Sequence, residues 1–144
     1  MPISDEFPLT LVHVLSNRIS RSYYSEVEAK FGVSVAEWRV LLTVAHEPGI
    51  TAAEITSYWA MEKMAVNRAI RRLVGDGYMD RARNPEDGRS YRLSLTGKGR
   101  ELYEKVLPAA GDRYRELISA LSKDEREAWL ASLRKMIARA DELS

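Results

Sequence analysis

Basic side chains concentrate in the middle of this 144-residue chain, where they could neutralise a polyanion. The stretch from Glu62 to Arg100 holds ten basic and five acidic residues, whereas the rest of the chain holds 12 basic and 16 acidic ones. The overall charge of +1 hides this division. A basic middle between acidic flanks indicates that the middle meets a polyanion and that the flanks have a different task. A solvated charged face is the alternative interpretation.

The densest part of the basic stretch has the period of a helix, from Glu62 to Asp76. Val66, Ile70 and Leu73 recur at the spacing of one buried face. The candidate contact residues on the other faces are Lys63, Met64, Ala65, Asn67, Arg68, Arg71 and Arg72. In a DNA major groove, Arg68 and Arg71 suit guanine, Asn67 suits adenine, and the side chains of Met64 and Ala65 suit thymine methyl groups. An ordinary amphipathic surface helix remains the alternative.

A hairpin is predicted next, with strands over Tyr78–Arg83 and Arg89–Leu95 around the turn-rich segment 84–88. An isolated two-stranded ribbon is barely stable in water, so a ribbon on a helical chain is expected to serve a purpose. Arg89 at its tip suits a narrow minor groove, and Asp87 can accept a hydrogen bond from the guanidinium. The remaining candidates, which suit phosphate contacts, are Arg81, Arg83 and Arg92.

Capping boxes at Ser34–Glu37, Thr51–Glu54 and Ser122–Glu125 predict three helix starts. A long helix over Leu9–Phe31 precedes them, and Thr96 restarts helix to about Leu121, with a bend expected at Pro108. The order of a helix, a short helix, a tight turn, a basic helix and a hairpin is that of a winged helix–turn–helix. The predicted fold class is therefore mainly α (α+β), a winged helix–turn–helix with flanking helices.

The chain resembles the MarR (multiple antibiotic resistance regulator) family over nearly its whole length. The likeness begins at Glu37-Trp38-Arg39-Val40-Leu41 and continues through Glu62-Lys63, Val66-Asn67-Arg68, Leu73 and Gly77-Tyr78. Its most specific part is Asp87–Gly99, an Asp-x-Arg followed by an alternating strand and a Thr-x-x-Gly helix start. Met64 and Ala65 depart from the small hydroxyl residues that relatives often carry, which puts base preference and one phosphate contact in doubt.

The resemblance implies a single domain over residues 1–144 that pairs with a second copy. Segments 9–31 and 98–142 would form the dimerisation helices, and 35–97 would form the winged helix–turn–helix lobe with a hairpin wing at 78–95. Two-fold symmetry would place two recognition helices about 34 Å apart on a near-palindromic operator in double-stranded DNA. A monomer that folds these helices back on itself is the alternative. The implied function is a ligand-responsive, sequence-specific repressor that acts as a homodimer.

Most members of the family release DNA when a small, often aromatic and anionic, ligand binds between the dimer helices and the DNA-binding lobe. The candidate ligand-binding residues here are His13, Asn17, Arg21, Trp38 and Arg39. A guanidinium could pair with a carboxylate, and Trp38 could stack on a ring. The alternative places Trp38 in the core and both arginines in surface or inter-lobe ion pairs.

Other functions find less support in the sequence. The chain has no cysteine and two histidines far apart, so neither a thiolate metal site nor clustered metal ligands are expected, and no cofactor is implied. It has no nucleophile elbow, dinucleotide fingerprint or Walker loop, so an enzyme is not expected. A metal-responsive regulator and a winged module that binds only protein remain the alternatives. With no signal peptide and no long apolar run, a cytoplasmic location without membrane contact is expected.

Overall fold

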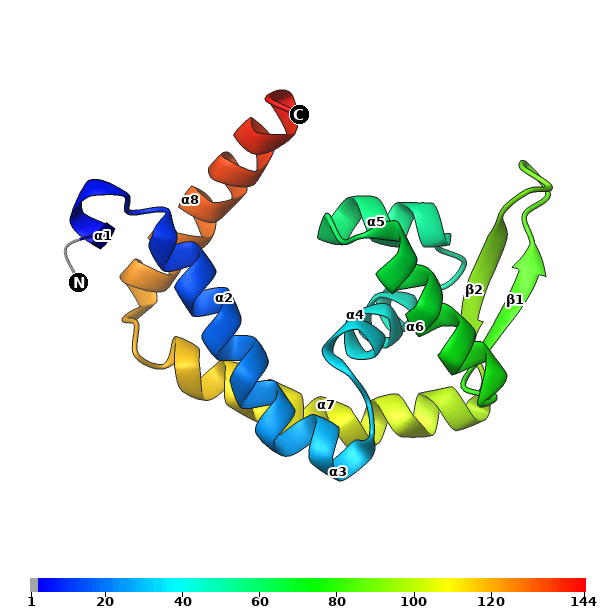
Figure 1. Ribbon diagram of the computed structural model, residues 1–144. Helices are drawn as coiled ribbons and strands as arrows, with labels where there is room; N and C mark the ends of the chain where they lie inside the picture. Colours follow the sequence, from blue (N-terminus) through cyan, green and yellow to red (C-terminus); the bar gives the residue numbers. More distant parts are fainter. Residues whose placement is uncertain (1–2) are drawn as a thin grey trace. The chain divides into compact units, whose positions relative to one another are not determined.

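The computed structural model describes residues 3–144, which form helices and one two-stranded antiparallel sheet (Figure 1). The chain divides into two compact units, Met1–Ala110 and Gly111–Ser144, so the boundary falls inside one long helix. The elements are α1 (Ile3–Glu6), α2 (Thr10–Tyr23), the π-helical turn η1 (Tyr24–Glu28), α3 (Ala29–Phe31), α4 (Val35–His46), α5 (Ala52–Trp59), α6 (Lys63–Gly75), β1 (Met79–Arg83), β2 (Tyr91–Leu95), α7 (Gly97–Ile118) and α8 (Lys123–Glu142).

The predicted helix starts and the predicted fold class are confirmed. Ser34, Thr51 and Ser122 each cap a helix in a complete capping box with the glutamate three residues later. The expected helix over 9–31 is helical throughout most of its length, but a π-helical turn interrupts it at η1 and widens the coil. Gly32 ends it with a φ of 65°, a left-handed conformation that glycine adopts without a steric penalty.

Helix α4 lies between two hydrophobic clusters. One face packs with α5, α6 and the hairpin; this lobe core consists of Val40, Val44, Ile55, Val66, Ala69, Ile70, Leu73, Met79 and Leu93. The other face packs with α2, η1 and the first part of α7; this junction core consists of Tyr23, Val27, Val33, Trp38, Leu41, Tyr103, Val106 and Ala110. Because α4 contributes to both, it ties the winged lobe to the long helices of the first unit.

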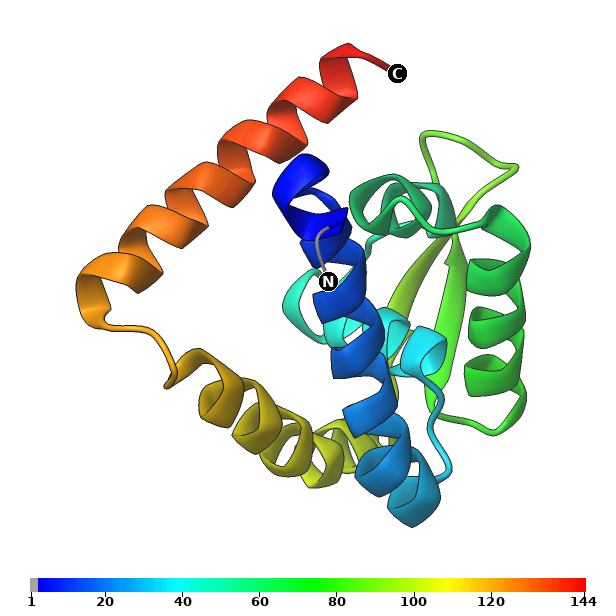
Figure 2. The ribbon, with the colours of Figure 1, turned by 60° about the vertical axis from the view of Figure 1, so that its left-hand side comes forward.

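The hairpin is anchored to the lobe by a third stretch of backbone. β1 and β2 pair from Met79 with Leu95 to Arg83 with Tyr91. The Gly49 amide donates to the Leu93 carbonyl at 2.8 Å, and the Leu93 amide donates to the Ile50 carbonyl at 3.0 Å. The strands therefore extend from a fixed base, and their loop lies at the end remote from α7 (Figures 1 and 2). This attachment, besides the buried side chains of the two strands, explains why so short a ribbon is ordered.

The turn between α6 and β1 meets the start of α7 at close range. The Thr96 hydroxyl donates to the Gly77 carbonyl at 2.6 Å and accepts from the Gly99 amide at 3.0 Å. Gly99 passes so close to the Tyr78 carbonyl that a β-carbon there would overlap it. The Thr-x-x-Gly sequence is therefore a packing requirement: threonine caps the helix, and glycine admits the neighbouring backbone.

The flanking helices carry apolar side chains that the chain leaves exposed. On α2, Val12 and Leu15 are 46% and 40% exposed, although the same stripe buries Tyr23 and Val27 further along. On α8 no residue is buried, and Ile137 is 61% exposed. No helix within residues 3–144 is both long and apolar enough to cross a membrane.

Candidate nucleic-acid interface

Helix α6 presents a polar, cationic face opposite its buried one. Val66, Ala69, Ile70 and Leu73 are buried in the lobe core. Lys63, Arg68 and Arg71 are exposed, and Met64 is 57% exposed at the first turn. Ala65 and Asn67 are half-buried. The helix therefore offers one turn of small and apolar side chains followed by two exposed guanidinium groups, a set that can donate to base edges and contact thymine methyl groups.

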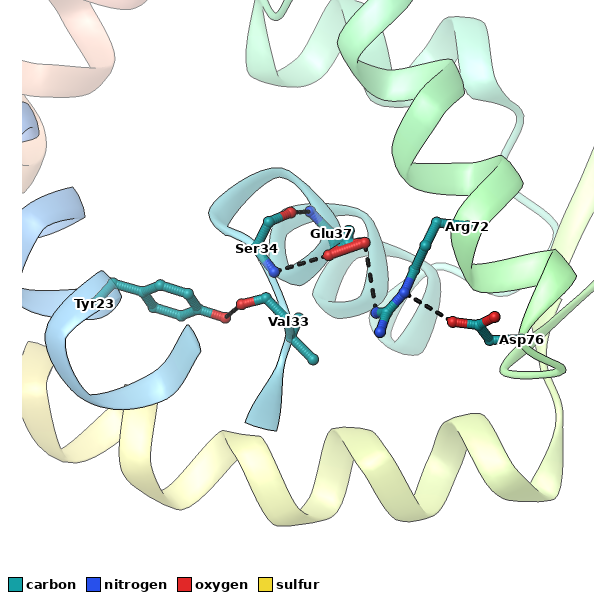
Figure 3. A network of polar contacts seen from close by, with 6 residues as sticks. All are labelled: Tyr23, Val33, Ser34, Glu37, Arg72 and Asp76. Carbon is teal, nitrogen blue, oxygen red and sulfur yellow. Dashed lines mark hydrogen bonds and ion pairs between the residues drawn. The ribbon is translucent and has the colours of Figure 1, made fainter. Parts of the chain in front are cut away.

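Arg72 is placed differently from the other cations of α6, as Figure 3 shows. Its Nη1 lies 3.4 Å from Glu37 Oε2, and its Nε lies 2.9 Å from Asp76 Oδ2. The guanidinium also lies 5.7 Å from the centre of the Tyr78 ring. Because Glu37 also accepts from the Ser34 amide in the cap of α4, one carboxylate connects the start of α4 to the last turn of α6.

The connection between α5 and α6 is short, and the end of α5 from which it leaves is held against α4. Ala60 adopts a left-handed conformation with a φ of 50°, the one non-glycine residue with positive φ among residues 3–144. Just before it, Trp59 Nε1 donates to Thr43 Oγ1 at 2.8 Å, and the Arg39 guanidinium lies 5.2 Å from the centre of the Trp59 ring. These contacts hold the end of α5 against α4 and so set where α6 begins.

The hairpin loop is braced by its own polar side chains. The Asp87 carboxylate accepts from the Arg89 amide at 3.0 Å, and the Gly88 carbonyl accepts from Arg83 Nη1 at 3.1 Å. Arg92 Nε donates to Asn84 Oδ1 at 3.2 Å. Two of the four predicted wing arginines therefore help to shape the loop. The Asp87 carboxylate accepts from the backbone amide of Arg89 and not, as expected, from its guanidinium.

The other two wing arginines lie at different heights on the ribbon. Arg89 is exposed in the loop, where its backbone is fixed by Asp87. Arg81 is exposed on β1, and its guanidinium lies 5.3 Å from the centre of the Tyr91 ring. Tyr91 alternates in phase with the buried Leu93 on β2, but it is 41% exposed because this end of the ribbon lies beyond the lobe core.

The five candidate ligand residues are not gathered into a cavity. His13, Asn17 and Arg21 are exposed on α2. Trp38 is only 2% exposed, stacks on Tyr103 with ring centres 5.8 Å apart, and leaves its indole N–H without an acceptor among the described residues. A cavity between α4 and α5 is lined instead by residues between Leu42 and Trp59, and none of the five lines it.

Two functional features of this unit were not predicted from the sequence. Glu37 was identified only as a helix cap, and its second contact, with Arg72, joins residues 35 positions apart that no local pattern relates. The cavity between α4 and α5 also has no signal in the sequence, since its lining residues are ordinary members of two amphipathic helices and a turn. No group of three or more potential metal ligands occurs within residues 3–144.

Comparisons with known proteins agree with this geometry. The model of the MarR family matches residues 31–90, from the end of α3 into the hairpin loop. The HTH-type transcriptional repressor Rv2887 of Mycobacterium tuberculosis is 26% identical over 136 residues, which span 92% of this chain and 98% of that protein. A MarR transcriptional regulator from Methanosarcina mazei superposes with a TM-score of 0.82 at 27% identity, over 96% of this chain and 99% of that one.

The structural likeness extends to a protein bound to DNA. A mutant MarR from Escherichia coli, complexed with operator DNA, superposes with a TM-score of 0.78 at 26% identity, over 93% of this chain and 96% of that one. The matched regions include the winged lobe and the helices on both sides of it. Together with the helix order, the anchored hairpin and the family-model match, these likenesses support a MarR-family transcriptional regulator.

Proposed function

We propose that the chain is a homodimeric repressor that binds a near-palindromic operator through α6 and the hairpin wing. The observation that carries this proposal is the two-sided character of α6, which buries four apolar side chains and exposes Lys63, Arg68 and Arg71. A major groove is wide enough for such a helix, and arginine is its commonest reader of guanine. The structural likeness to a MarR from Escherichia coli that is complexed with operator DNA supports DNA as the ligand.

The wing supplies the second contact in this proposal. Arg89 is exposed in a loop whose backbone is braced by Asp87, Arg83 and Asn84, so its side chain can enter a minor groove with little loss of backbone freedom. Arg81, lower on the ribbon, would contact phosphates. Arg83 and Arg92 would shape the loop and add positive charge near the backbone. Phosphate contacts raise the affinity for all sequences and carry no sequence information.

Arg72 serves as a positioning residue for α6 in this scheme. Its two carboxylate partners neutralise it, and its contact with Glu37 fixes the C-terminal half of α6 against α4. Among the cations of α6, the base-reading role then falls to Arg68 and Arg71. The sequence-based assignment of Arg72 to direct contact with DNA becomes the weaker alternative.

The homodimer is proposed from the unburied apolar stripes of α2 and α8. Each helix carries apolar side chains at the spacing of a buried face, yet these side chains are exposed. They are Val12 and Leu15 on α2 and Trp129, Leu130 and Ile137 on α8. An exposed apolar stripe of this kind on a helix is typical of a protein–protein interface. Repression, as the alternative to activation, is supported by the name of the Mycobacterium tuberculosis relative, a transcriptional repressor.

The test is selection of binding sites from random double-stranded DNA, followed by titration of the selected site across a salt series. We expect a near-palindromic site and an affinity that falls steeply with salt. Arg89→Ala should weaken binding to that site by about 1–3 kcal/mol and relax its sequence preference. Arg81→Ala should weaken binding to all DNA alike and flatten the salt slope by about one unit.

Failure to enrich any site, with the protein folded and dimeric, would contradict the proposal and favour a module that binds only protein. A change of sequence preference in Arg81→Ala would show that base and phosphate contacts are assigned to the wrong arginines. Light scattering during size exclusion, measured on the same sample, checks the dimer independently of DNA.

A further inference from the structure

A cavity of about 740 Å³ opens between the C-terminal half of α4 and α5, within the first unit. Its volume falls within the range of small-molecule sites, about 300–1,000 Å³. We name it the α4–α5 cavity. The lining residues that could recognise a ligand are Leu42, Glu47, Ile50, Glu54, Tyr58 and Trp59.

The walls of the cavity combine apolar surface, aromatic rings and negative charge. Tyr58 and Trp59 stand edge to face with ring centres 5.5 Å apart, and Leu42 and Ile50 add aliphatic surface. Glu47 and Glu54 are exposed and line the same space, whereas no lysine or arginine is among the lining residues. An anionic ligand would therefore meet two carboxylates and no cationic side chain among the lining residues themselves.

The aromatic part of the wall is suited to positive charge. Ring faces of tryptophan and tyrosine attract cations, and the Trp59 ring already has the Arg39 guanidinium 5.2 Å from its centre. Several polar groups of the lining are occupied within the protein. Trp59 Nε1 donates to Thr43 Oγ1, Thr43 Oγ1 donates to the Arg39 carbonyl, and His46 Nδ1 lies 2.9 Å from the Leu42 carbonyl. The carboxylates and ring surfaces are thus the main recognition elements.

We propose that the α4–α5 cavity binds an aromatic organic cation, held by the rings of Tyr58 and Trp59 and by the carboxylates of Glu47 and Glu54. Glu54 can cap α5 and bind the cation at the same time. Its Oε2 accepts from the Thr51 amide in the cap, and its carboxylate lines the cavity. This chemistry differs from the anionic ligand expected from the sequence. The binding site stands without reference to DNA, but its regulatory consequence depends on the proposed function.

Occupation of the cavity would reach the DNA-binding elements through direct contacts. Gly49 and Ile50 line the cavity, and their backbone exchanges two hydrogen bonds with Leu93 of β2. Trp59 lines it as well and immediately precedes Ala60, the turn into α6. A ligand can bind more tightly when one of these two walls is displaced. It then favours conformations in which the wing or α6 is displaced as well, and this changes the affinity for DNA.

The binding test uses two probes of nearly identical shape and opposite charge, tetraphenylphosphonium and tetraphenylborate, titrated calorimetrically into the full chain. We expect the cation to bind at least about tenfold more tightly than the anion. The Glu47→Gln/Glu54→Gln double variant should lose about tenfold in affinity for the cation, since glutamine retains the cap acceptor but not the charge. Glu104→Gln, an exposed position on α7 outside the cavity, is the matched control and should bind as the parent does.

The location is tested separately by fluorine NMR of protein labelled with 5-fluorotryptophan. The chain has three tryptophans, and the Trp59 signal should move first and furthest on addition of tetraphenylphosphonium. Equal affinity for both probes, preference for the anion, or an unmoved Trp59 signal would overturn the assignment.

The regulatory consequence is read from the effect of tetraphenylphosphonium on binding to a selected operator. A lower or higher operator affinity with the parent chain, absent in the double variant, supports the coupling. Cation binding that leaves operator affinity unchanged overturns the coupling. If no operator can be selected at all, the proposed function fails, while the calorimetric and NMR results still decide whether the cavity binds the cation.

Discussion

The winged lobe buries its apolar side chains, whereas the flanking helices leave many of theirs exposed. In the lobe, α6 buries Val66 and Leu73 completely, and α4 is covered on two faces. In the second unit, α8 buries no residue although it carries Trp129, Leu130 and Ile137. Exposed apolar surface costs about 25 cal/mol for each Å² left in water. One copy of the chain therefore completes the core of the lobe but leaves the apolar side chains of α8 uncovered, which is the basis of the proposed dimer.

The largest effect on stability is expected at Gly99, where the start of α7 lies closest to the backbone of Tyr78. The Gly99→Ala variant places a β-carbon on the Tyr78 carbonyl, and since this is backbone, the start of α7 must move. We expect a loss of about 3 kcal/mol in the free energy of unfolding. Thermal and urea unfolding measure it. Gly75→Ala, where a β-carbon meets nothing within 4 Å, is the control and should not destabilise the chain. Equal effects at both positions would contradict the close approach.

A second substitution should affect association through α8 without affecting the folding of the winged lobe. Ile137→Glu introduces a charge into the exposed stripe of α8, and we expect it to weaken the dimer by about 2 kcal/mol or more while the lobe stays folded. Sedimentation equilibrium measures association, and near-ultraviolet circular dichroism monitors the tertiary packing. Ala131→Glu, on the opposite side of the same helix by its spacing, should leave association unchanged. If the parent chain is itself monomeric, the proposal that the exposed stripe of α8 forms a dimer interface is wrong.

A smaller effect is expected at Arg72. Replacing it by methionine removes the ion pairs with Glu37 and Asp76, and because the arginine side chain is 36% exposed, the loss of stability should be about 1 kcal/mol. Operator affinity should also fall, because α6 loses its attachment to α4. Arg68→Met should weaken operator binding without lowering the melting temperature. If Arg68→Met instead lowered stability and Arg72→Met weakened only operator binding, Arg68 would be the positioning residue and Arg72 the DNA contact.

The smallest effect concerns the cap of α8. Hydrogen bonds from the Ser122 amide and hydroxyl lower the pKa of Glu125 below its ordinary value. A carboxyl group with a lowered pKa stabilises the folded helix above its unfolded-state pKa, and this contribution disappears as the pH falls through the folded-state value. Ellipticity at 222 nm should therefore decline slightly more in the parent chain than in Glu125→Gln between neutral and acidic pH. Identical acid profiles would show that the cap does not respond to pH.

Much of the fold was predictable because its signals are local. Capping boxes, the i, i+4, i+7 spacing in α6 and the alternation in β2 depend on residues within one or two turns of each other. The site was predictable in part. The exposed positions of Lys63, Arg68, Arg71 and Arg89 follow from the same periodicity, whereas the π-helical turn at η1 has no sequence signal that we can identify.

By itself, the sequence determined the order of the elements, the likeness to the MarR family and the basic face of α6, because each rests on short-range patterns. The tertiary structure alone decided which cations are engaged within the protein, as Arg72 is by Glu37 and Arg92 by Asn84. It also placed Trp38 in the junction core and opened the α4–α5 cavity. The physical reason is common to all of these: ion pairs, burial and cavities are set by residues that are distant in sequence and meet only when the chain is packed.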